Sequence, residues 1–217
     1  MRSLTVLIIT LFTGTVYAHS GGVDSNGGHF NRKSGEYHCH RPGCVVEGQK
    51  VAKPGAVGEK YNRKSWPHWI DADRDCQNTR AEILIRDSLE KVQFKRSKGC
   101  LVTYGRWEGP YTGQIFTKAS DLDIDHLVPL YHAHKTGGGS WSREMKKKFA
   151  NDPDNLLAVD DATNQAKGAK SPVRRKPPLK SYWCEYAERW NAVKARYGLI
   201  ISNAEEQSLA AMMERCG

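Results

Sequence analysis

The sequence predicts an α+β domain that has a strand, a long loop, a second strand and a helix at its centre. Two short apolar runs, residues 124–128 and 156–159, have the length of buried strands and are separated by a polar segment. Asp161 then stands where a helix over residues 162–168 needs its N-cap. Six cysteines are available to stabilise the chain by disulfide bonds.

The first eighteen residues have the pattern of an export signal. Arg2 gives a positive start, residues 4–16 are mostly apolar, and Val16 and Ala18 have the spacing that signal peptidase requires. The apolar run is too short for a membrane-spanning helix, which needs about 20 residues. We therefore expect residues 1–18 to be removed, leaving a secreted or periplasmic protein without a membrane anchor, which we assume to be a monomer.

The chain is strongly basic, with a formal net charge of +9 at pH 7. Residues 141–196 hold 13 Lys or Arg against 7 Asp or Glu, so much of the excess lies in that segment. A basic surface favours polyanions, and nucleic acid is the commonest of them. Anionic membranes and cell-wall polymers also fit this charge, so charge alone leaves the partner open.

An even number of cysteines in an exported chain favours disulfides over free thiols. The connectivity is open from sequence alone. Our preferred prediction pairs neighbours along the chain: Cys39 with Cys44, Cys76 with Cys100, and Cys184 with Cys216.

Composition divides the mature chain into three parts. Residues 19–48 are rich in Gly, His and Cys, and they have too few aliphatic side chains to form a core without metal or disulfide bridging. Residues 49–65 mix Lys, Pro, Gly and Ser without periodicity and are predicted to be a linker. Residues 66–217 suit one compact domain.

A capping box formed by Thr79 and Glu82 predicts a helix over residues 80–92. Two short alternating strands, residues 101–104 and 114–117, then follow on either side of a turn rich in Gly and Pro.

Aromatic residues recur every three or four positions from Tyr182 to Tyr197, and we interpret this stripe as core packing of a helix. Gly198 is expected to end that helix. Ser202 and Glu205 form a second capping box, which opens a last helix running to the end of the chain.

Asp125 and His126, on the first central strand, are the candidate catalytic pair. Neighbouring residues of a strand point to opposite sides, so the carboxylate can reach a metal while the imidazole faces substrate. A twist or bulge would bring both to one phosphate. Asn155 precedes the second strand, and Asn164 and Lys167 share a face of the predicted helix. Together these residues could supply an activated water, a Lewis acid and a phosphate contact, which phosphodiester hydrolysis needs.

Several motifs around these residues resemble, in the same order, those of exported bacterial HNH endonucleases related to the C-terminal domain of GmrSD-type restriction enzymes. The core is also similar to the HNH domain of RNA-guided CRISPR nucleases. The resemblance implies a ββα-metal (HNH, or His-Me finger) core with additional helices. The motifs are Asp75-Cys76-Gln77-Asn78-Thr79-Arg80, Pro110-Tyr111-Thr112-Gly113, Asp123-Ile124-Asp125-His126-Leu127-Val128-Pro129-Leu130, residues 151–159, Asn164-Gln165-Ala166-Lys167-Gly168 and Tyr197-Gly198-Leu199.

The resemblance also implies roles for individual residues. His126 would be the general base, Asp125 and Asn164 would bind the metal, Asn155 would brace the loop between the strands, and Lys167 would meet a phosphate. Because Asn164 stands where the third HNH letter is often His, oxygen ligands favour Mg²⁺ or Mn²⁺ over Zn²⁺. Hydrolysis would leave 5′-phosphate and 3′-hydroxyl ends.

Five further residues near this core keep open roles. Asp123 either orients His126 or supports the metal ligands without contacting the metal itself. His132 and His134 could join His126 around a metal, although the family pattern does not require them. Arg174 and Arg175, in a stretch more basic than its relatives suggest, are candidate DNA contacts together with Lys167.

The segment from His19 to His40 resembles the short YHYH-type module of exported bacterial proteins. His29, His38 and His40 could hold a transition metal there, with Asp24, Cys39 or Cys44 completing the site. Alternatively, Cys39 and Cys44 form a disulfide and the histidines are only hydrogen-bonded.

These observations predict an exported, metal-dependent endonuclease acting on DNA, most plausibly double-stranded and without sequence specificity, since no separate reading module is visible. The rival hypothesis is a non-catalytic, basic, metal-binding envelope protein that binds nucleic acid or cell-wall polymer. A general base beside a metal carboxylate favours the enzyme, because a binder needs only basic residues.

Overall fold

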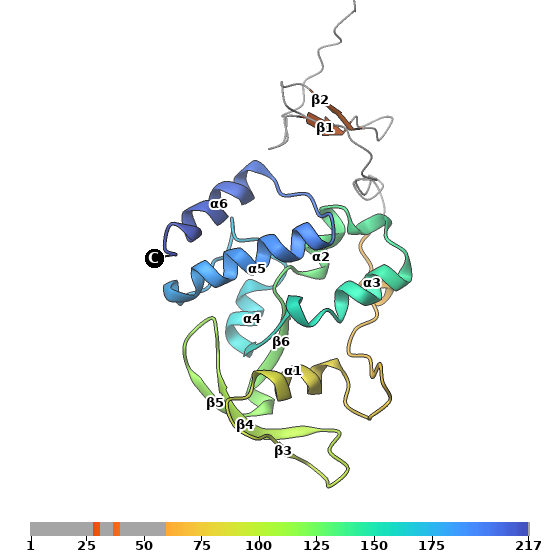
Figure 1. Cartoon of the computed structure of the whole chain (residues 1–217), viewed down its shortest axis with the longest axis vertical. Helices are drawn as coiled ribbons and strands as arrows, with labels where there is room; N and C mark the ends of the chain where they lie inside the picture. Colours follow the sequence, from red (N-terminus) through yellow and green to blue (C-terminus); the bar gives the residue numbers. More distant parts are fainter. Residues whose placement is uncertain (1–27, 31–36, 40–59, 217) are drawn as a thin grey trace, which may run out of the picture.

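A computed structural model describes residues 28–30, 37–39 and 60–216 of the chain (Figure 1). Several predictions fall on other residues: the export signal at residues 1–18, most of the linker, the Cys39–Cys44 bridge and His40. They stay predictions.

The described part of the N-terminal module is a short antiparallel pair of strands, β1 (Gly28–Phe30) and β2 (Tyr37–Cys39). His29 pairs in register with His38 across these strands.

The centre of the main domain is the antiparallel pair β6 (Leu122–His126) and β7 (Leu156–Asp160), followed by helix α4 (Asp161–Lys167). The predicted order of strand, loop, strand and helix is therefore present. The cap of α4 lies one residue earlier than predicted, because the Asp160 carboxylate accepts a hydrogen bond from the Thr163 N–H at 2.8 Å. The pairing of β6 with β7 is regular throughout, so the strand does not bulge at His126.

Each face of the β6–β7 pair packs against a different hydrophobic core. One core holds Ile124 and Leu156 together with side chains of α1 (Thr79–Asp87) and β4 (Val102–Glu108). The other holds Leu157 and Val159 together with α5 (Trp183–Arg196). Figure 1 shows the same arrangement, with α1 and the β3–β5 sheet at one end, α5 and α6 at the other, and β6 and α4 between them.

The remaining elements surround this unit. Strands β3 (Gln93–Phe94), β4 and β5 (Ile115–Lys118) form an antiparallel sheet in that order. The other helices are α2 (Leu130–Lys135), α3 (Arg143–Ala150) and α6 (Asn203–Met213), with short 3₁₀ turns at Arg63–Ser65, Ala119–Asp121, Gly138–Ser140, Pro153–Asn155 and Lys180–Tyr182.

Helix α1 differs from its prediction at both ends. Its cap is Asn78 rather than Thr79, because the Asn78 side chain accepts from the Ala81 N–H at 3.1 Å. The helix stops at Asp87 instead of continuing to residue 92. Ser88 is extended, and the Leu89 N–H donates to the Arg106 carbonyl at 2.7 Å, which draws the chain alongside β4.

Strand β4 continues through residues that the sequence assigned to a turn. Gly105 lies within this strand. A larger residue would not fit there, because its Cβ would come within 2.6 Å of the Trp107 ring. The Gly and Pro content of residues 105–113 therefore reflects a close approach at Gly105 as well as the turn after Glu108.

Most of the C-terminal predictions are confirmed, but α6 ends at Met213 and not at Cys216. Tyr186 and Trp190 of α5 are fully buried, which confirms that the aromatic stripe packs in the core. Gly198, with φ of 59°, follows the end of α5 in the left-handed conformation. The Ser202 side chain caps α6 by accepting from the Glu205 N–H at 3.3 Å.

The second half of the predicted capping box is different, since the Glu205 carboxylate turns inward. It accepts hydrogen bonds from the fully buried Lys194 at 2.8 and 3.0 Å and from the Trp190 indole at 2.6 Å, and it lies 3.2 Å from His132. This buried ion pair ties α2, α5 and α6 together.

The structure contains the predicted bridges Cys76–Cys100 and Cys184–Cys216. Tyr61, within the predicted linker, packs against Tyr131 and His134, so the folded domain begins before Trp66. In the part of the chain that the structure describes, no helix combines the length and apolarity needed to cross a bilayer.

Replacing Cys184 and Cys216 by Ser should lower the free energy of unfolding by on the order of 3 to 4 kcal/mol, because the bridge closes a separation of 32 residues and restricts the unfolded chain. Urea unfolding would measure this loss. Hydrogen exchange should show that α6 loses protection in this variant but not when Cys76 and Cys100 are replaced. Equal loss of α6 protection in both variants would contradict the assignment.

The Glu205 ion pair should make stability depend on pH. Burial alone would raise the pKa of Glu205, but hydrogen bonding with His132 and the charge of Lys194 lower it from 4.5 to about 2. A carboxyl with a lower pKa in the folded state stabilises fully above its unfolded pKa and loses that contribution as the pH falls towards 2. Between pH 4.5 and 2, unfolding free energy should therefore fall more steeply in the wild type than in Glu205→Gln. The exposed neighbour Glu206→Gln, as control, should follow the wild type, and parallel curves for Glu205→Gln would refute the pair's role.

Candidate active site

His126 is the last residue of β6 and is almost fully buried. Its Nε2 lies 2.9 Å from the carbonyl oxygen of Ala150, at the end of α3. A carbonyl oxygen can only accept a hydrogen bond, so Nε2 carries the proton and Nδ1 keeps its lone pair. This is the tautomer that a general base needs in order to accept a proton on Nδ1.

The segment before α1 covers the His126 ring. The indole of Trp69 stacks on the imidazole at 5.7 Å with an interplanar angle of 28°, and His68 approaches edge-on at 6.5 Å. Burial lowers the pKa of His126 from 6.5 to about 3 and outweighs the opposing effect of the Ala150 hydrogen bond. The imidazole is therefore neutral at pH 7.

Asp123 and Asp125 point to the other side of β6, where α4 packs. The Asn164 amide donates to Asp123 at 2.9 Å, and the Lys167 ammonium bonds both Asp125 oxygens at 3.0 and 2.9 Å. Residues two apart on a strand and three apart on a helix each share a face, so the two pairs form successive rungs between β6 and α4.

The Asp125 rung is enclosed. The Tyr111 hydroxyl donates to Asp125 at 2.6 Å, and Lys167 also donates to the carbonyl oxygen of His126 at 2.9 Å. Burial raises the pKa of Asp125 and lowers that of Lys167, while the attraction between the two charges acts in the opposite sense on each. The carboxylate and the ammonium thus depend on one another to remain charged.

Asn155 is fully buried just before β7 and closes the loop between the two strands. Its side chain accepts from the Val128 N–H at 2.8 Å and donates to the Val128 carbonyl at 3.2 Å, while its own carbonyl accepts from Leu127 at 2.8 Å. These are the bracing bonds expected of Asn155, and they hold the chain that leaves His126.

Comparison with known proteins identifies the family of this chain. The family described as "GmrSD restriction endonucleases, C-terminal domain" matches residues 78–212, which is more than half of the chain. The chain belongs to this family. The match includes β6, β7 and α4 with all the residues of the two rungs.

A protein described as "Uncharacterized secreted protein", from Arthroderma benhamiae, is 45% identical over 168 residues, which are 76% of this chain and 80% of that relative. No solved structure matches the chain. The family expected from the motifs is thus found, whereas the bacterial source and the YHYH-type module remain predictions.

Within this GmrSD-type domain, two expectations about side-chain direction need correction. Lys167 does not reach outward to a phosphate, because its ammonium is buried against Asp125. Asp123 does not orient His126, since it lies on the opposite face and contacts Asn164; the Ala150 carbonyl holds the imidazole instead. Asn164 and Lys167 share the face of α4 that packs on β6, as predicted, and Asn164 bonds Asp123 there.

The suggested cluster of His126, His132 and His134 does not form. His132 and His134 belong to α2, and His132 is directed to Glu205 and Lys194. Among the described residues, the close groupings of metal-capable side chains include none of these histidines.

Arg174 and Arg175 lie exposed on a turn closed by their N–H groups on the Ser171 carbonyl. Arg175 lines a small cavity of about 10 Å³ together with Lys167 and Tyr111. The basic stretch therefore passes beside the Asp125 rung, which the sequence alone did not indicate.

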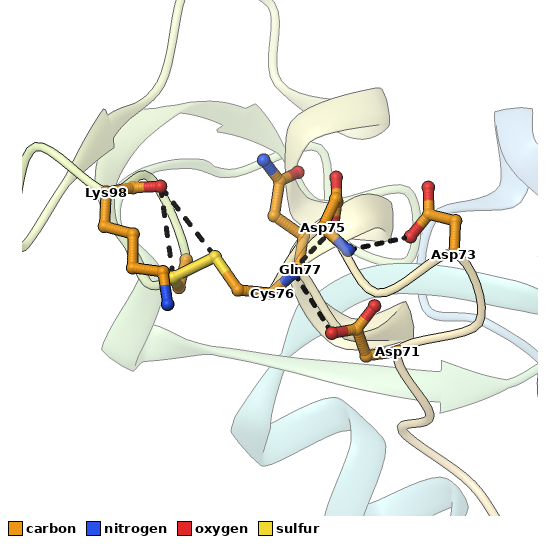
Figure 2. The surroundings of a disulfide bond; sticks show 7 residues. Asp71, Asp73, Asp75, Cys76, Gln77 and Lys98 are labelled. Atoms are coloured by element: carbon orange, nitrogen blue, oxygen red, sulfur yellow. Dashed lines mark hydrogen bonds between the residues drawn. A yellow bond between two sulfur atoms is a disulfide. The ribbon is translucent and has the colours of Figure 1, made fainter.

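An acidic loop that no prediction named lies before α1 (Figure 2). Carboxylate oxygens of Asp71, Asp73 and Asp75 lie within 4.8 Å of one another, and all three residues are exposed. Their spacing, with Glu82 further on, is that of positions 1, 3, 5 and 12 of an EF-hand loop, and this signal was available in the sequence. These oxygens could hold a cation, but each carboxylate already accepts a hydrogen bond from a backbone N–H of the loop.

The mutual dependence of Asp125 and Lys167 can be tested by stability. Lys167→Met should lower the free energy of unfolding by about 3 to 5 kcal/mol, since it leaves the Asp125 carboxylate buried without its cation. The double variant Asp125→Asn/Lys167→Met should recover much of this loss. Urea unfolding would measure both, with the exposed Lys170→Met as matched control. Additive losses in the double variant would show that the two charges are independent.

Proposed function

We propose that the protein is an exported, metal-dependent endonuclease that hydrolyses DNA phosphodiester bonds, with His126 as general base. The observation that carries this proposal is the His126 ring itself. Its Nε2 is held by the Ala150 carbonyl, its Nδ1 keeps a lone pair, and the ring is neutral at pH 7. Membership of a restriction-endonuclease family supports the reaction class.

The base would act on a water molecule. Nδ1 of His126 removes a proton from that water, and the imidazolium so formed keeps its Nε2–H bond to Ala150. The oxygen of the water attacks phosphorus as the bond to the 3′ oxygen breaks. The departing 3′ oxygen takes a proton from solvent, which leaves 5′-phosphate and 3′-hydroxyl ends. The Trp69 indole covers a face of the ring, while the Nδ1 lone pair that takes the proton lies in the ring plane.

Asp125 and Asn164 would hold Mg²⁺ or Mn²⁺, with Asp123 beside them. The donor set fits, because carboxylate and amide oxygens suit hard divalent cations. The Lys167 ammonium is the cation that contacts Asp125 in the structure, so the metal would have to displace it. Asn164 uses its amide N–H on Asp123, which leaves its oxygen for the metal. When bound, the metal would stabilise charge on the phosphate and the departing oxygen.

Substrate binding would rest mainly on phosphate contacts. Arg174 and Arg175 are both exposed, and Arg175 lines the small cavity beside Lys167, so these residues are suited to contact the DNA backbone. Such contacts carry no sequence information, so we propose double-stranded DNA without sequence specificity as the substrate. Lys167 would serve this role only after leaving Asp125.

Two observations support export. The relative from Arthroderma benhamiae is described as secreted, and the chain carries disulfide bonds, which persist in oxidising compartments. In the N-terminal module, a second site for a transition metal at His29, His38 and His40 stays a proposal, supported by the register that pairs His29 with His38.

Cleavage of supercoiled plasmid by the purified mature protein tests the proposed function. Wild-type protein should nick and linearise the plasmid with Mg²⁺ or Mn²⁺ and lose this activity in EDTA. His126→Ala should lower the rate by roughly 10²-fold or more, the usual scale for loss of a general base, while DNA binding in EDTA stays unchanged.

Asp125→Ala and Asn164→Ala should raise the metal concentration needed for half activity, or abolish cleavage. Asp121→Ala, an exposed residue just before β6, is the matched control and should behave as the wild type. DNA binding without any cleavage under these conditions would favour the non-catalytic binding protein, and full activity of His126→Ala would exclude His126 as the base.

A further inference from the structure

Asn151, which follows α3, uses its whole side-chain amide to join distant parts of the chain. Its amide N–H groups donate to the Pro67 carbonyl at 2.8 Å and to the Lys147 carbonyl at 2.7 Å. Its oxygen accepts from the Ile70 N–H at 3.3 Å and from the Thr79 hydroxyl at 3.0 Å. An Asn amide offers two donor hydrogens and two acceptor positions, so all four are engaged.

The segments that Asn151 joins are those that touch the His126 ring. The preceding residue, Ala150, supplies the carbonyl that holds Nε2. Pro67 and Ile70, which Asn151 also binds, stand on either side of His68 and Trp69, whose rings pack on the imidazole.

The backbone of the covering segment depends on such support. Trp69 has φ of 57°, in the left-handed region that a bulky residue adopts only when surrounding contacts hold it there. The hydrogen bonds of Asn151 to Pro67 and Ile70 bracket this residue. Without them, the indole has less to keep it against His126.

We propose that Asn151 is a positioning residue for His126: it clamps the 67–70 segment to the end of α3 and thereby sets the tautomer and the plane of the imidazole. The inference rests on the proposed role of His126 as general base. If the Ala150 carbonyl moves away, the proton is free to sit on Nδ1, and that tautomer has no lone pair facing the water.

The first test needs no variant of Asn151. In ¹⁵N-labelled mature protein, imidazole resonances of His126, assigned by comparison with His126→Gln, should show the proton on Nε2 in the wild type. A wild-type imidazole protonated on Nδ1 would overturn the clamp.

The second test compares Asn151→Ala with two controls. Asn151→Ala should populate the Nδ1–H tautomer of His126 and lower kcat for plasmid cleavage at least tenfold, with KM changed less than about twofold, since DNA contacts are elsewhere. Thr79→Val removes one of the four bonds and should have a smaller effect. Asn191→Ala, on α5, is the matched control and should change neither quantity.

Asn151→Asp keeps the acceptor but loses both donor bonds, and it serves if the alanine variant does not fold. A folded Asn151 variant with wild-type tautomer and kcat would overturn the inference while leaving the proposed function intact. Conversely, wild-type cleavage by His126→Ala would defeat the proposed function, and the NMR result would still decide whether Asn151 fixes the ring.

Discussion

The alternation of side chains along β6 is the constraint on which the rest of the site depends. Because β6 pairs with β7 without a bulge, Asp123 and Asp125 face α4, whereas His126 faces the segment before α1. Each face also belongs to a different hydrophobic core, so the strand cannot slip by one residue without exchanging apolar and polar side chains on both sides. The candidate base and the candidate metal ligands therefore lie on opposite faces of the strand.

Burying this chemistry requires compensation, and the structure supplies it with fixed partners. Lys167 and Tyr111 donate hydrogen bonds to Asp125, and the Ala150 carbonyl accepts one from His126. The Asn155 side chain bonds the backbone of the segment that follows β6. The same principle recurs outside the site at Lys194 and Glu205. In each case a buried polar group is tolerated because its hydrogen-bonding capacity is met. At β6, Asp125 is enclosed by its partners, and a face of the His126 ring is covered by the Trp69 indole.

Sequence patterns predicted the strands and the helices well where the pattern is local. The strand that carries the Asp-x-Asp-His run, the aromatic stripe of α5, the Ser202 cap and two of the three cysteine pairs are confirmed in the described residues, whereas the roles of the site residues stay predictions. Prediction failed where a partner far along the chain decides. Helix α1 ends early because Arg106 captures Leu89, and the carboxylate of Glu205 leaves its helix terminus because Lys194 lies beside it. The acidic loop is a different case, since its spacing was visible in the sequence and was overlooked.

The sequence by itself determined the order of elements, the family resemblance and the identity of the candidate base, because periodicity, caps and motifs depend on neighbours within a few positions. Only the tertiary structure decided where each polar side chain points. Lys167 turns to Asp125 and not to solvent, Asn164 bonds Asp123, and Asn151 joins residues about eighty positions away. These hydrogen bonds depend on which groups are buried together when the two hydrophobic cores pack on the β6–β7 pair. A buried donor or acceptor bonds the partner that this packing places within reach.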